Sequence, residues 1–95
     1  MERGFMAVMA MIQHQVADYD TWRKAYDGFA DAQKAGGVTQ QSVYRAKDDP
    51  SNLLVTHGFA TAADAEAFLA STELRDAMHQ AGVTGQPRIE IYQDA

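Results

Sequence analysis

The sequence predicts one α+β domain whose strands and helices follow one another as β-α-β-β-α-β. Short runs with apolar residues at every second position predict the strands, because the side chains of a strand point alternately to the two faces of a sheet. Longer stretches with apolar residues every three or four positions predict the helices. Clusters of glycine, proline, asparagine and aspartate separate these stretches, and a chain of 95 residues forms one small domain.

The first strand is predicted over residues 6–16, after a start at residues 1–5 that we expect to be disordered. Every second residue from Val8 to His14 shares one face, and the residues between them share the other. Both faces are largely apolar, which is typical of a central strand that is covered on both sides.

A helix is predicted over residues 18–35. Asp18 or Asp20 is suited to cap its start, because a short carboxylate accepts hydrogen bonds from the free N–H groups of the first turn. Capping explains this pair of carboxylates better than acid–base chemistry does. Gly36 and Gly37 are expected to end the helix, since glycine adopts the left-handed conformation without a clash at Cβ.

Aromatic residues form a stripe along this helix. Trp22, Tyr26 and Phe29 are spaced i, i+4 and i+7, so their side chains lie on one face. Such a stripe must cover an apolar surface. It belongs either to the hydrophobic core or to the wall of a cavity.

Two further strands are predicted on either side of a turn. Residues 38–47 alternate apolar and polar side chains as an edge strand does, and residues 48–52 have the composition of a turn. Residues 53–60 are predicted as the third strand. This strand is apolar on both faces, like the first, and carries His57 on one of them.

The second helical region is predicted to be split into two helices. Residues 61–64 have the spacing of a capping box, and Ser71 offers a second cap. Gly82 is expected to stop this region. Residues 88–93, in which isoleucines alternate with other side chains, are predicted as the last strand.

These strands predict a ferredoxin-like antiparallel sheet of order 4-1-3-2, with the first and third strands in the centre. The helices of such a fold cover one sheet face, and apolar groups on the other face remain exposed. A domain of this size buries only about two-thirds of its unfolded surface. We therefore expect a homodimer that packs through the open sheet face.

The charge balance argues against nucleic acid as a partner. Eight Lys and Arg stand against 13 Asp and Glu, for a net charge of −5, and the basic residues are scattered. No apolar run approaches the roughly 20 residues of a membrane span, so we expect no membrane association and a cytoplasmic protein. The sequence has no cysteine, phosphate-binding loop, nucleophile elbow, zinc motif or dinucleotide fingerprint, so we expect neither a metal nor a cofactor.

Residues 16–23 (Val-Ala-Asp-Tyr-Asp-Thr-Trp-Arg), residues 68–78 (Phe-Leu-Ala-Ser-Thr-Glu-Leu-Arg-Asp-Ala-Met) and the order of the elements resemble the dimeric α/β-barrel superfamily. That superfamily includes antibiotic-biosynthesis monooxygenases, small cyclase-like proteins and haem-degrading monooxygenases. The resemblance implies a cleft between helices and sheet in each subunit. It also implies a small cofactor-independent monooxygenase or cyclase-like enzyme that acts on an apolar aromatic molecule. The alternative is a non-catalytic dimer that binds a small ligand or a partner.

The haem-degrading branch of this superfamily does not fit the chain. By the resemblance, its ligand histidine falls on Met78, with His79 one residue further along. A shift of one residue on a helix turns a side chain by about 100°. The asparagine of its first strand is missing, and Phe68 stands where that branch has a tryptophan. We therefore expect no haem chemistry.

His57 is the candidate catalytic residue, because a histidine on a central strand could act as the base that takes a phenolic proton. The alternative is a buried histidine satisfied by a hydrogen bond. His14 is a weaker candidate, since it lies near the helix start and could bond to Asp18 or Asp20. An antiparallel register puts the two histidines about four residues apart, too far for a shared metal ion.

The candidate substrate-binding residues are aromatic: Trp22, Tyr26, Tyr44 and Phe59. The first two could form the wall of the cleft, with packing in the core as the alternative. For Tyr44, on an edge strand, the alternatives are packing and a dimer contact. An enzyme would have a cavity with His57 pointing into it, whereas a structural module would fill that volume with aromatic side chains.

Overall fold

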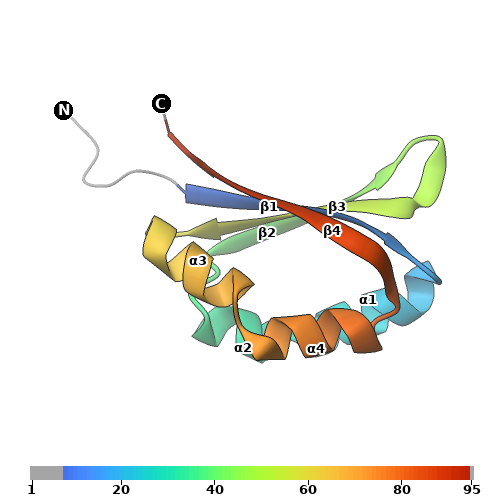
Figure 1. The fold of residues 1–95 in the computed structure, drawn as a ribbon, viewed down its shortest axis with the longest axis horizontal. Coiled ribbons are helices and arrows are strands. Elements are labelled where there is room, and N and C mark those ends of the chain that lie inside the picture. Colours follow the sequence, from blue (N-terminus) through green and yellow to red (C-terminus); the bar gives the residue numbers. More distant parts are fainter. Residues whose placement is uncertain (1–7, 95) are drawn as a thin grey trace.

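A computed structural model describes residues 8–94, in which one sheet of four strands packs on a layer of helices (Figure 1). The elements in order are β1 (Val8–Val16), α1 (Tyr19–Gly28), α2 (Ala30–Ala35), β2 (Gln40–Ala46), β3 (Asp49–Phe59), α3 (Ala62–Leu69), α4 (Thr72–Gln80) and β4 (Val83–Gln93). The predicted disordered start and the first residues of the predicted first strand lie outside the described residues. No helix of this range is long and apolar enough to cross a membrane.

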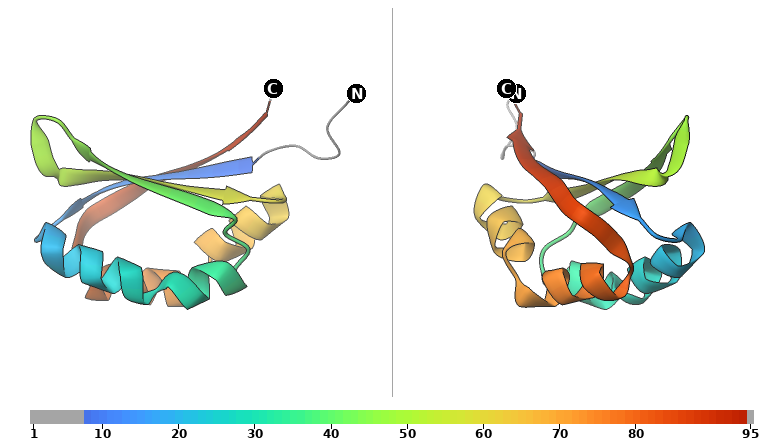
Figure 2. Two further views of the ribbon diagram at one scale, coloured as in Figure 1. Left: turned by 180° about the vertical axis from the view of Figure 1, so that it is seen from behind. Right: turned by 45° about the vertical axis from the view of Figure 1, so that its right-hand side comes forward.

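The sheet has the predicted order, β2-β3-β1-β4, with every neighbouring pair antiparallel. β1 pairs with β3 so that Ala10 lies opposite His57 and Ile12 lies opposite Val55. These side chains therefore share one face of the two central strands. All the helices lie against that face, and no helix or strand of residues 8–94 covers the opposite face (Figure 2). The predicted ferredoxin-like α+β fold is confirmed.

Side-chain caps start α1, α3 and α4 where the sequence predicts them. Asp18 accepts hydrogen bonds from the backbone N–H of Thr21 (2.9 Å) and from its hydroxyl (2.7 Å). Thr61 and Ser71 start α3 and α4 by accepting from backbone N–H groups three residues further on. Local hydrogen bonding thus fixes where these helices begin, and it confirms the split of the second helical region.

The single helix predicted over residues 18–35 is interrupted at Phe29. The N–H of Phe29 bonds to the carbonyl of Tyr26, only three residues back, at 3.1 Å. Gly28 stands at the end of α1, and glycine is among the weakest helix formers, so the regular ladder gives way there to a tighter turn. The chain then continues as the short helix α2, which ends at Gly36 and Gly37 as predicted.

The turn predicted over residues 48–52 is wrong, because β3 begins at Asp49 and only residues 47–48 lie in the turn. The register with β2 shifts between Arg45 and Ala46, which leaves Pro50 in an irregular part of the ladder. A proline fits such a position because no N–H is needed there. Its carbonyl accepts a hydrogen bond from Nε of Arg45 at 3.0 Å.

The last strand is longer than the prediction of residues 88–93, because β4 begins at Val83. Its register against β1 shifts between Gln13 and Gln15, and the extra residues of β4 at this irregularity include Gly85 and Pro87. Gly85 has a φ of +71°, which glycine adopts readily. β4 is an edge strand, where a missing proline N–H costs no ladder bond on the outer side.

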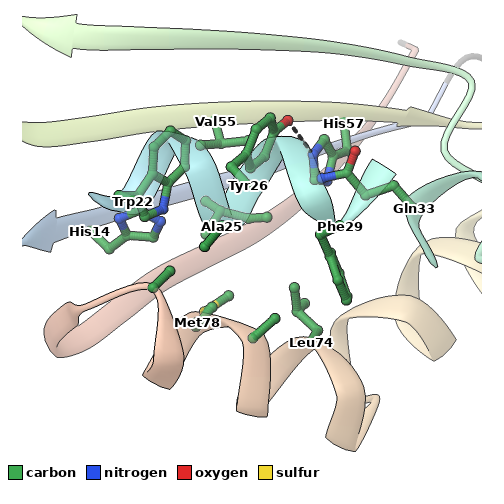
Figure 3. Close-up of a pocket in the computed structure, with 13 residues that line it drawn as sticks. His14, Trp22, Ala25, Tyr26, Phe29, Gln33, Val55, His57, Leu74 and Met78 are labelled. Carbon is green, nitrogen blue, oxygen red and sulfur yellow. Dashed lines mark hydrogen bonds between the residues drawn. The ribbon is translucent and has the colours of Figure 1, made fainter. Parts of the chain in front are cut away.

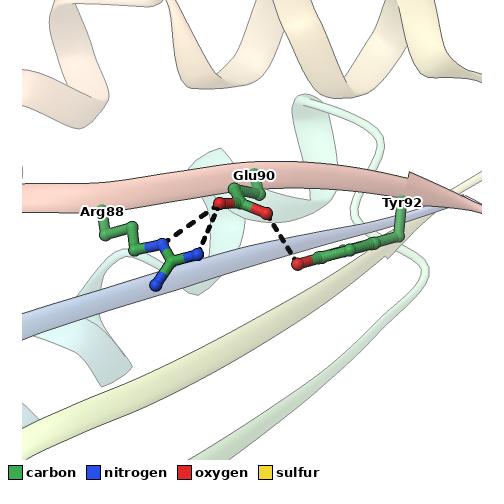
Figure 4. A network of polar contacts seen from close by, with 3 residues as sticks. All are labelled: Arg88, Glu90 and Tyr92. Atoms are coloured by element: carbon green, nitrogen blue, oxygen red, sulfur yellow. Dashed lines mark hydrogen bonds and ion pairs between the residues drawn. The ribbon is translucent and has the colours of Figure 1, made fainter.

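The open face of the sheet carries apolar side chains between polar edges. Met9 is 40% exposed, Tyr44 56% and Tyr92 45%. At the β4 edge, Glu90 accepts a hydrogen bond from the hydroxyl of Tyr92 and forms an ion pair with Arg88 at 2.8 Å (Figure 4). Residues two apart on a strand share a face, which is why these three side chains meet.

Candidate functional site

A cavity lies between the helix-facing side of the sheet and the helices α1 and α4 (Figure 3). Side chains of β1 and β3 form its roof, the aromatic stripe of α1 forms one wall, and Leu74 and Met78 of α4 lie on the far side. Its free volume is about 40 Å³. That is room for a few water molecules at most, because one water needs about 10–15 Å³ of such space.

The wall contributed by α1 is a row of stacked rings. Trp22 is 3% exposed, and its ring stacks on Tyr26 with centroids 4.7 Å apart. The edge of His14 meets Trp22 at 5.9 Å, and Tyr26 lies nearly parallel to His57 at 6.1 Å. The predicted stripe is therefore both part of the core and the wall of the cavity.

A hydrogen-bonded pair forms the polar part of this wall. The hydroxyl of Tyr26 lies 3.0 Å from Nε2 of His57 and donates a short hydrogen bond to Oε1 of Gln41. A phenol has one proton to give, so Nε2 of His57 is assigned as the donor to the Tyr26 oxygen. Nδ1 of His57 then carries the lone pair. This nitrogen is buried and has no hydrogen-bond partner among the described residues.

Burial sets the protonation of the polar groups in the cavity. It lowers the pKa of His57 to about 4 and lowers the pKa of His14 as well. It raises the pKa of Tyr26, although a hydrogen bond with Gln33 partly opposes that shift. At neutral pH, His57 and Tyr26 are both uncharged, and Nδ1 of His57 is available as an acceptor.

His14 forms no hydrogen bond with Asp18 or Asp20, and the carboxylate of Asp18 instead caps α1. The imidazole instead packs edge-on against Trp22, and its Nδ1 has no hydrogen-bond partner among residues 8–94. His14 lies opposite Leu53, four positions along β1 from the partner of His57. Within the described chain, no cluster of three or more His, Cys, Asp and Glu could hold a metal ion.

The structure brings together four of the six candidate residues, since His14, Trp22, Tyr26 and His57 all line the cavity. Phe59 does not line it but lies behind it, with its ring 6.5 Å from His57. Tyr44 lies on the opposite face of the sheet, because its neighbour Val43 pairs with Val55 and so faces the helices. His79 is exposed on α4, as expected for a surface position.

Gln33 is a polar cavity residue that the sequence prediction missed. It is 3% exposed, although glutamine is usually a surface residue. Its spacing contains a signal, because Gln33 follows Tyr26 by seven residues and Phe29 by four, and so continues the aromatic stripe into α2. A polar residue in register with an apolar stripe is a good candidate for a site.

The fold is that of antibiotic biosynthesis monooxygenases. A protein from Caulobacter crescentus, a "putative antibiotic biosynthesis monooxygenase", is 17% identical with a TM-score of 0.74, and the match covers 94% of this chain and 90% of that one. A protein of the same description from Nitrosomonas europaea is 15% identical with a TM-score of 0.71, over 99% and 94% of the two chains. SnoaB, a cofactor-independent oxygenase from Streptomyces nogalater, is 11% identical with a TM-score of 0.72, over 90% of both chains.

These structures show that the chain shares their ferredoxin-like fold, and identities this low describe the fold alone. No family model matches the sequence, and no curated protein matches it.

Proposed function

We propose that the protein is a small cofactor-independent monooxygenase or cyclase-like enzyme whose substrate is an apolar aromatic molecule bound in the cavity between helices and sheet. The unpartnered Nδ1 of His57 carries the proposal. A buried acceptor without a partner is costly, and the hydroxyl of a bound phenol would satisfy it. The presence of a cofactor-independent oxygenase among proteins of the same fold supports the reaction class.

The chemistry of His57 follows from its environment. Tyr26 holds the ring through Nε2, which leaves Nδ1 as the acceptor that a ligand hydroxyl would satisfy, while the flat wall of Trp22 and Tyr26 would pack on the ligand ring. A phenol has a pKa near 10, and transfer of its proton to an imidazole with a pKa of about 4 is uphill by roughly 8 kcal/mol. His57 is therefore first the acceptor that orients the hydroxyl. It acts as a base only while phenolate and imidazolium stabilise each other in the cleft.

The size of the cavity supports a second candidate function. A free volume of about 40 Å³ is well below the about 300 Å³ of a typical ligand site, so a substrate must displace side chains such as Met78. Methionine rotates easily and adapts to its neighbours. If the side chains do not yield, the protein is a non-catalytic dimer whose function lies on its surface.

Oxygen consumption tests the enzymatic proposal. The wild type is mixed with a panel of quinols and anthrone-like phenols, and O₂ uptake is followed together with product formation. We expect uptake with at least one compound and a loss of more than tenfold in His57→Gln. His79→Gln, at an exposed position on α4, is the matched control and should retain full activity. Binding without O₂ uptake and without product formation from any compound would overturn the enzymatic proposal and favour the second candidate.

We also infer that two copies pack through their open sheet faces. The inference is supported by the exposed apolar side chains there, which include Met9, Tyr44 and Tyr92. In a two-fold dimer the same patch serves both copies. Light scattering at micromolar concentration should give about twice the chain mass of 10.4 kDa. Met9→Lys should shift the protein towards the monomer, and a monomeric wild type would refute the inference.

A further inference from the structure

A second cavity adjoins the first on the side of α2 and α3. It is an outer groove with a free volume of about 380 Å³, much larger than the inner cavity. Its walls come from α2, α3 and the start of α4. Phe29 lines both spaces, so its ring lies at their common boundary.

The position of Phe29 allows a rotation of its side chain to open a connection between the two spaces. Phe29 occupies the break between α1 and α2, and its ring lies at the edge of the inner cavity between His57 and Leu74 (Figure 3). On the other side, the centroid of its ring lies 6.3 Å from that of Phe68. The ring centroid of Phe68 in turn lies 5.7 Å from that of His57. Rotation of the Phe29 ring would join the two spaces. The joined cleft falls within the size range of ligand sites, about 300–1,000 Å³.

The outer groove is acidic. Asp64 and Glu73 line it, and its lining contains no lysine or arginine. Both carboxylates are exposed, and neither forms an ion pair within residues 8–94. Each lies in the first turn of a helix, where the partial positive charge is only about half a unit. The groove therefore has a net negative charge.

We propose that the inner cavity and the outer groove form one ligand site, and that its ligand is a phenol or other aromatic alcohol with a positively charged amine at the far end. The hydroxyl donates to Nδ1 of His57, the ring lies beside Phe29, and the amine lies near Asp64 and Glu73. The aromatic end rests on the proposed function, whereas the charged end rests on the acidic groove alone. A carboxylate at the far end would face two like charges.

Three phenols that differ only at one end test this proposal: tyramine, 4-ethylphenol and 3-(4-hydroxyphenyl)propanoate. Trp22 is the only tryptophan of the chain and lines the inner cavity, so quenching of its fluorescence reports binding at this site. At low ionic strength we expect tyramine to bind about fivefold more tightly than the propanoate, with 4-ethylphenol between them, because exposed charges each contribute little. The difference should shrink in high salt.

The double variant Asp64→Asn/Glu73→Gln should remove the difference between tyramine and the propanoate. Asp20→Asn/Asp76→Asn is the matched control, because it removes two exposed carboxylates that line neither space. Equal affinities of the three phenols for the wild type would overturn the inference and leave the proposed function intact. A preference for tyramine that survives in the Asp64→Asn/Glu73→Gln variant would also overturn it. If none of the three quenches Trp22, this inference fails, and the oxygen-consumption assay with the larger panel decides the proposed function separately.

Discussion

Burial of His57 should make the stability of this protein depend on pH between about 4 and 6.5. The unfolded chain takes up a proton at this histidine near pH 6.5, but the folded protein does so only near pH 4. Between these values the unfolded state binds more protons, so stability is full above pH 6.5 and is lost as the pH falls. His14 has a pKa shifted in the same direction and adds to the effect.

The size of the effect follows from the pKa of His57. At pH 5.0 the imidazole of His57 is still mostly neutral in the folded state. In the unfolded state it is protonated, because pH 5.0 lies 1.5 units below the ordinary pKa of 6.5. At about 1.4 kcal/mol per unit, His57 alone removes about 2 kcal/mol of stability at pH 5.0 relative to pH 7.5. A small domain often has only 5–15 kcal/mol in total, so the loss is readily measured.

Urea unfolding at pH 7.5 and 5.0, followed by the fluorescence of Trp22, measures this loss. The test compares the change between the two pH values in the wild type, in His57→Gln and in the control His79→Gln. Comparing changes removes any difference in overall stability between the proteins. The carboxylates of Asp18 and Glu90 have lowered pKa values and matter mainly below pH 5, and all three proteins share them. The reasoning is refuted if His57→Gln loses as much stability between the two pH values as the wild type does.

Three further substitutions test the packing and the caps by urea or thermal unfolding. Gly36→Ala should destabilise the protein by about 1–3 kcal/mol, because the new Cβ would lie 2.5 Å from Cδ1 of Phe68. Gly28→Ala should be neutral or stabilising, because a Cβ at that position meets nothing within 4 Å. Equal effects of the two substitutions on stability would refute this reasoning. Trp22→Ala should lower the free energy of unfolding by about 3–5 kcal/mol, because it removes a buried ring between the inner cavity and the core. A loss below about 1 kcal/mol would show that neighbouring side chains fill the space. Thr61→Ala should cost about 1 kcal/mol through loss of the bond from the Asp64 N–H, with Thr61→Ser as the variant that retains it.

Much of the site could be predicted because it lies on regular elements. The i, i+4, i+7 spacing put Trp22 and Tyr26 on one helical face, and alternation put His14 on an apolar face of β1 and His57 on an apolar face of β3. Tyr44 was assigned to the cavity only because it is aromatic. Which face of β2 is buried depends on its register with β3, and the sequence carries no direct sign of that register. The hairpin and the start of β4 were missed because proline and glycine lie within strands there, at irregular places in the ladder.

The sequence by itself determined the order of the elements, the caps that start α1, α3 and α4, and the apolar faces that assemble the sheet and helices. Each of these depends on neighbours within about four residues along the chain. Only the tertiary structure decided that Tyr26 holds His57, that Nδ1 of His57 has no partner among residues 8–94, and that Phe29 lines two cavities. These contacts join residues from separate elements. They depend on how helices and strands pack, which patterns along the chain do not encode.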